Sequence, residues 1–202
     1  MKLNEIEFKQ KLPLKKENDL NRINAAKLNP NLSKILKDNL KREILELELS
    51  YKQNLMITKL NNTPCPTFNF TNYEGGKTNL SDLKGKYVLI DIWATWCRPC
   101  IEEIPYMKNL IEKYKDKNIA FVSISVDYEK DFEKWKSVVK TKEMKGFQLY
   151  ADKNWNSDFI VALGMYQLPR FLLLDPDGVI INSNSAKPSD PALTETFNKL
   201  LQ

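Results

Sequence analysis

A nearly continuous apolar run, from Tyr87 to Trp93, constrains the fold more than any other feature of this 202-residue sequence. Such a run is typical of a strand that is buried on both faces of a sheet. Further extended segments are predicted at 67–71, 77–80, 119–126, 146–150, 170–174 and 179–181, and helices at 99–115, 131–142, 157–163 and 194–201. Because strands alternate with helices and end in a hairpin, we predict an α/β fold in which helices cover both sides of a mixed sheet.

The first 60 residues differ from the rest, since they contain no Gly, Cys or Trp. A shorter helix is predicted over 19–28 and ends before Asn29-Pro30, and Asn31 or Ser33 is predicted to cap a second, longer helix. One face of that helix collects an apolar stripe, which consists of Leu32, Leu36, Leu40, Ile44, Leu47, Tyr51 and Leu55. This Leu32–Leu55 stripe is expected to contact an upstream domain or a second copy in a dimer, or to pack on its own domain. We place a domain boundary between a helical N-terminal extension, 1–60, and a domain at 61–202.

Charge and residue usage exclude several classes of function. The 31 Lys and Arg residues and 26 Asp and Glu residues often alternate in sign, which indicates a solvated surface and not a nucleic-acid site. Histidine is absent from the sequence, so His-dependent triads and His-ligated metal sites are excluded. No apolar stretch approaches the roughly 20 residues that cross a bilayer, and the charged N-terminus does not resemble a signal peptide.

The chemistry-bearing motif is Cys97-Arg98-Pro99-Cys100, which follows the buried strand directly and opens the next helix. The positive end of the helix dipole favours a thiolate, so we expect the pKa of Cys97 to fall below about 8.5. A spacing of three residues places Cys100 on the same helix face, close enough for a disulfide. A zinc site would need four ligands, and a structural disulfide across so short a loop would stabilise little. Dithiol–disulfide exchange is therefore the favoured chemistry.

Residues 88–100 resemble the thioredoxin superfamily, and 79–86, 103–107 and 122–127 resemble its TlpA/ResA-like branch of thiol:disulfide oxidoreductases. Residues 166–175 resemble the cis-proline strand of that branch, so the resemblance covers about 64–202. It implies a thioredoxin-like three-layer α/β/α sandwich with a mixed central sheet, preceded here by the α-helical extension. The peroxidase branch is disfavoured, because Thr95 lies two residues before Cys97 instead of three.

The resemblance also implies catalytic roles. Cys97 would be the more exposed, attacking sulfur, and Cys100 the more buried, resolving one. Asp91 would be a buried carboxyl group with a raised pKa that takes the proton of Cys100. Glu103 matches an acidic residue that tunes the site in ResA-like proteins, although an ordinary acid of a helix is the alternative.

Three further residues are predicted to bind substrate. Pro169 would form the cis-proline, Leu168 would offer backbone groups to an extended substrate segment, and Trp96 would flank the sulfur. Many relatives carry Thr directly after this proline, where this sequence has Arg170. The sequence therefore does not predict what surrounds the residue after Pro169. Cys65 is expected to be a lone, partly buried thiol. No bound cofactor or metal is expected.

The family resemblance implies an enzyme that acts on protein thiols and disulfides, in the direction of reduction, with a membrane or soluble electron donor. It also implies an extracytoplasmic, periplasmic location, with a membrane anchor or further protein upstream of Met1 in the precursor. The alternative is a thioredoxin-fold module that binds peptides or proteins and whose redox activity is incidental.

Overall fold

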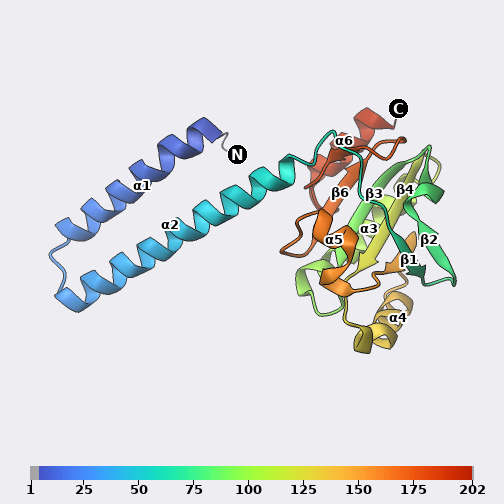
Figure 1. Ribbon diagram of the computed structural model, residues 1–202, viewed down its shortest axis with the longest axis horizontal. Helices are drawn as coiled ribbons and strands as arrows, with labels where there is room; N and C mark the ends of the chain where they lie inside the picture. Colours follow the sequence, from blue (N-terminus) through green and yellow to red (C-terminus); the bar gives the residue numbers. More distant parts are fainter. Residues whose placement is uncertain (1–4, 202) are drawn as a thin grey trace. The chain divides into compact units, whose positions relative to one another are not determined.

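The computed structural model describes residues 5–201 and divides the chain into two compact units, 1–55 and 56–202. The first unit contains helix α1 (Glu5–Ala25) and most of helix α2 (Pro30–Thr58), which run alongside each other (Figure 1). The rings of Phe8 and Tyr51 stack with centroids 3.8 Å apart, and Lys15 pairs with Glu43. Tyr51 belongs to the Leu32–Leu55 stripe, so part of that stripe packs within the extension itself.

The structure corrects two predictions about these helices. The first helix begins at Glu5 and includes Pro13, whereas the sequence predicted only 19–28. Asn29 caps the second helix, because its side-chain oxygen accepts a hydrogen bond from the Leu32 amide at 2.9 Å. Pro30 therefore takes the first helical position, where a missing N–H costs nothing. No helix in residues 5–201 has the length and apolarity that a bilayer crossing requires.

The second unit is built on one seven-stranded sheet with the order β2-β1-β5-β4-β3-β6-β7. Its strands are β1 (Asn69–Asn72), β2 (Lys77–Asn79), β3 (Tyr87–Trp93), β4 (Ile119–Ser125), β5 (Phe147–Tyr150), β6 (Arg170–Leu174) and β7 (Ile180–Asn182). Strands β3, β4 and β5 are parallel, and the other neighbours pair antiparallel. The sheet is therefore mixed, as predicted.

Helices cover both faces of this sheet (Figure 1). They are α3 (Arg98–Lys113), α4 (Phe132–Thr141), α5 (Asp158–Ala162) and α6 (Pro191–Leu200), with short 3₁₀ turns η1 (Leu80–Leu83), η2 (Glu129–Asp131) and η3 (Asn154–Asn156). On one face, Leu89 packs with Met107 of α3 and Phe197 of α6. On the other face, the next residue, Ile90, packs with Trp135 of α4 and Phe159 of α5. Period-two alternation along β3 thus separates two cores.

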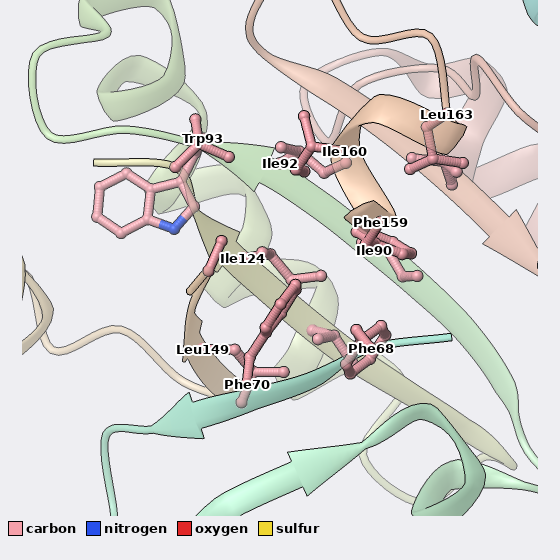
Figure 2. Close-up of a cluster of buried hydrophobic side chains, with 14 of the residues drawn as sticks. Phe68, Phe70, Ile90, Ile92, Trp93, Ile124, Leu149, Phe159, Ile160 and Leu163 are labelled. Atoms are coloured by element: carbon pink, nitrogen blue, oxygen red, sulfur yellow. The ribbon is translucent and has the colours of Figure 1, made fainter. Parts of the chain in front are cut away.

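The core on the α4/α5 face is rich in aromatic rings (Figure 2). Phe159 makes edge-to-face contacts with Phe68 and Phe70, at centroid distances of 5.2 and 6.0 Å. Such pairs contribute about 0.5–1.5 kcal/mol each beyond their burial. This packing fixes the sheet on which the redox motif is mounted.

Candidate active site

Cys97 and Cys100 form a disulfide at the N-terminus of α3, with their Cα atoms 5.3 Å apart. Cys97 is the N-cap residue, and its sulfur accepts a hydrogen bond from the Cys100 amide at 3.2 Å. The two residues are 5% and 4% exposed, so the disulfide form does not show the predicted difference in exposure. The helix N-terminus places partial positive charge and the Cys100 amide at Cys97, which favours its thiolate after reduction.

The loop before Cys97 is fixed by a carboxylate from the neighbouring strand end. Asp127 accepts hydrogen bonds from the amide and the hydroxyl of Thr95, at 2.9 and 2.8 Å. It also accepts one from the hydroxyl of Ser125 at 2.7 Å. Trp96 follows this anchor and is 50% exposed, so a large apolar surface lies beside the disulfide, where the sequence predicted a substrate contact.

Asp91 lies on β3 and faces α3. Its carboxyl group is buried, and Oδ1 has no hydrogen-bond partner among the described residues. The pKa of Asp91 is raised to about 7: desolvation by burial is the main cause, a hydrogen bond with Ser123 opposes it, and the charge of Glu103 adds to it. A small cavity joins Asp91 to Ile104 of α3, which lies one turn beyond Cys100. The carboxyl group is therefore protonated below neutral pH and able to exchange a proton near the motif.

Glu103 is buried on α3 and is held by the connection between β7 and α6. Its carboxylate accepts hydrogen bonds from the amide and hydroxyl of Ser189, at 2.9 and 2.8 Å. Lys187 lies 3.0 Å from the same carboxylate, and this contact raises the pKa of the lysine. Glu103 is thus a fixed buried charge and not a solvated acid of the helix surface.

The Leu168–Pro169 peptide bond is cis and precedes β6. Arg170, the first residue of β6, pairs with Ile92 near the end of β3 in the antiparallel register. Pro169 therefore lies at the sheet edge at which β3 ends and the loop to α3 begins. Leu168 packs against the cluster of buried residues that includes Cys97 and Cys100.

This arrangement of a CxxC disulfide, a buried carboxyl group and a cis-proline can be compared with known proteins. Residues 62–183, more than half of the chain, match the AhpC/TSA family. The chain belongs to the AhpC/TSA family. The thiol-disulfide oxidoreductase ResA of Bacillus thuringiensis subsp. konkukian (strain 97-27) is 36% identical over 135 residues, which are 67% of this chain and 75% of ResA.

Solved structures agree with this assignment. A Bacteroides vulgatus protein described as a thiol-disulfide oxidoreductase is 44% identical, with a TM-score of 0.61 over 69% of this chain and 90% of that one. A thiol-disulfide oxidoreductase from Bacteroides fragilis NCTC 9343 is 28% identical, with a TM-score of 0.61 over 69% and 100%. This AhpC/TSA-family chain is accordingly a ResA-like thiol-disulfide oxidoreductase with a thioredoxin-like fold. The predictions of fold, family and activity are confirmed.

Arg170 occupies the position that sequence analysis left open. Its guanidinium is buried and donates to the carbonyl of Ser183 at 2.9 Å and to that of Leu163 at 3.0 Å. Burial lowers the pKa of Arg170 to about 10. Arg170 therefore ties the end of α5 and the end of β7 to the strand that follows the cis-proline.

Cys65 is buried in the core and makes no disulfide. Burial raises the pKa of its thiol to about 12, so at neutral pH this sulfur is protonated and a poor nucleophile. Sequence reasoning did not identify Lys187, Ser189, Asp127 or Gln148 as neighbours of site residues. Ser123 lies beside Asp91 because β3 and β4 pair in parallel, a pairing that the sequence analysis did not predict.

Proposed function

We propose that Cys97 is the nucleophile, Cys100 the resolving thiol and Asp91 the proton acceptor of this oxidoreductase. In the reduced protein, the Cys97 thiolate attacks a disulfide of the substrate and releases one substrate thiolate. Cys100 then gives its proton to Asp91, and its sulfur attacks the mixed disulfide at Cys97. The second substrate thiolate leaves, so two electrons pass to the substrate and Cys97–Cys100 becomes a disulfide.

The observation that carries this proposal is the CxxC disulfide at the start of α3, together with a buried carboxyl group with a pKa of about 7 on the strand that faces the same helix. A general base works best when its pKa lies near the working pH. Glu103 supports the role of Asp91, since its negative charge raises the pKa of that group.

Protein thiols and disulfides are the substrates that the family implies, and we propose that they bind in extended form between Trp96 and Leu168-Pro169. The cis-proline site lies at a sheet end where backbone groups can pair with a substrate segment. By resemblance to the ResA-like branch, we propose reduction as the direction, a membrane or soluble donor for re-reduction, and an extracytoplasmic location. We also propose the boundary between extension and domain at residues 60 and 61.

Trapping of the mixed disulfide tests these roles. Cys100→Ser removes the resolving sulfur, so a covalent complex with a disulfide-containing peptide should accumulate and should release under dithiothreitol. Cys97→Ser should give no complex, and Cys65→Ser should behave as the unmodified chain. A complex that forms through Cys100 in Cys97→Ser would contradict the assignment of the nucleophile.

The direction is tested by the reduction potential of the Cys97/Cys100 pair in glutathione buffers. A value near or below about −220 mV is expected for a reductant, whereas a value near about −120 mV identifies an oxidant. The second value would leave the exchange chemistry intact and reverse the proposed electron flow.

A further inference from the structure

A row of three polar side chains crosses the sheet beneath α3. The register pairs Asp91 of β3 with Ser123 of β4, and Ser123 with Gln148 of β5. All three residues are buried. Because neighbouring strands lie about 4.8 Å apart, the backbones of Asp91 and Gln148 are separated by roughly 9.6 Å, with only the short Ser123 side chain between them.

Two oxygen atoms in this row can each still accept a hydrogen bond. Neither Oδ1 of Asp91 nor Oε1 of Gln148 has a hydrogen-bond partner among the described residues. The amide nitrogen of Gln148 donates to the carbonyl of Lys145 at 2.7 Å, which fixes the orientation of the amide. Buried polar atoms are seldom left unpaired, since each costs about 1–3 kcal/mol.

Both atoms belong to residues that line one cavity of about 10 Å³. That volume holds about one water molecule, and a stable buried water needs two to four polar partners. Asp91, Ser123 and Gln148 supply three such partners. The cavity also reaches Lys108 of α3 and Lys145, whose side chains extend to solvent.

We propose that Asp91, Ser123 and Gln148 hold one buried water molecule, and that this water transfers the Asp91 proton to solvent on the Lys108 side of α3. The proposal rests on the proposed role of Asp91. After Cys100 has given its proton to Asp91, the carboxyl group passes a proton to the water. The water releases a proton toward solvent, and the reverse sequence supplies the proton when the disulfide is reduced. Gln148 is a positioning residue in this scheme.

The charged groups around the carboxyl group are consistent with an exit on this side. Glu103 of α3 lies on the side of the β7–α6 connection, where Ser189 and Lys187 hold it. Lys108 is held over the end of α4 by the Lys142 carbonyl at 3.2 Å and by Glu143 at 3.1 Å. Lys145 lies in the connection between α4 and β5. The positive charges of Lys108 and Lys145, which line the cavity, disfavour a proton that stays inside it and favour its release to solvent.

The test compares Gln148→Met with Met144→Leu, a control that changes an apolar wall of the same cavity. The readouts are the carboxyl chemical shift of Asp91 against pH and the rate at which the Cys97 mixed disulfide is resolved. Gln148→Met should shift the Asp91 midpoint to higher pH, because the carboxylate loses its ordered water. It should also slow resolution roughly tenfold, less than the 10²–10⁴-fold contribution of a general base itself. Met144→Leu should change neither readout by more than about twofold.

Asp91→Asn separates this inference from the proposed function. If Asp91→Asn slows resolution and Gln148→Met changes neither readout, the water relay is refuted and the role of Asp91 stands. If Asp91→Asn leaves the rate unchanged, the role of Asp91 and the relay both fail. A high-resolution crystal structure of the unmodified chain gives a check that needs no variant. One ordered water within hydrogen-bond distance of Asp91 Oδ1 and Gln148 Oε1 is expected, and an empty cavity would overturn the proposal.

Discussion

Asp91→Asn should make the stability of the oxidised protein less sensitive to pH. In the folded chain the carboxyl group has a pKa of about 7, against 3.8 for an ordinary Asp, because burial penalises the charged form. The folded state therefore binds this proton more tightly than the unfolded state does. Stability from this group is fully present below about pH 4 and is lost as pH rises toward the folded pKa of about 7.

The size of the effect follows from the shift. Each pKa unit corresponds to about 1.36 kcal/mol, so ionisation of Asp91 opposes folding by about 4 kcal/mol above neutral pH. Within the range from about pH 5 to about pH 8, stability falls over roughly two pH units, up to the folded pKa. The free energy of unfolding therefore decreases by roughly 2–3 kcal/mol. Asn keeps the shape and has no charge to desolvate, so Asp91→Asn should lack this loss.

Urea unfolding of both proteins at the two pH values measures the difference. The oxidised form is used because Cys97 and Cys100 do not titrate in a disulfide. The free energy of unfolding of Asp91→Asn, relative to the unmodified chain, should rise by roughly 2–3 kcal/mol from about pH 5 to about pH 8. A difference that stays constant across this range would refute the claim that Asp91 is desolvated in the folded state.

Three further substitutions test other parts of the structure. Lys187→Met should change stability little, because the lysine is exposed, and should raise the pH midpoint of thiol exchange by leaving the Glu103 charge less compensated. Arg170→Met should raise KM for peptide disulfides and leave the reduction potential unchanged, since it frees two backbone carbonyls near the cis-proline; a shifted potential would contradict this. Gly146→Ala should lose about 1–3 kcal/mol more than Gly76→Ala. Both glycines have positive φ, but only at Gly146 would a Cβ lie 2.6 Å from a backbone oxygen.

Much of the domain could be predicted from local patterns. The strands at Tyr87–Trp93 and Arg170–Leu174 have the predicted bounds, because buried apolar runs end sharply at polar or turn residues. The helix at Glu5–Ala25 was mostly missed, since its residues show little apolar periodicity, although Pro13 lies within it. Cys97 and Cys100 could be placed at a helix start because they follow the buried strand directly.

The surroundings of the site residues could not be predicted in the same way. Ser189 is 86 positions from Glu103, and only the packing of α6 beside α3 brings them together. Gln148 becomes a neighbour of Ser123 through the order of the strands, which a sequence of alternating elements does not fix. Arg170 illustrates a third limit, because nothing in the sequence distinguishes a buried arginine from an exposed one.

The alternation along β3 has a consequence for how this enzyme can diversify. Asp91 and Leu89 face α3 and α6, whereas Ile90 and Ile92 face the aromatic core. Changes at the buried carboxyl group and changes in the packing of the aromatic core therefore fall at alternate positions of the same strand. A library that varies only the Asp91, Ser123 and Gln148 positions would sample changes at the buried carboxyl group while it leaves the aromatic face unchanged.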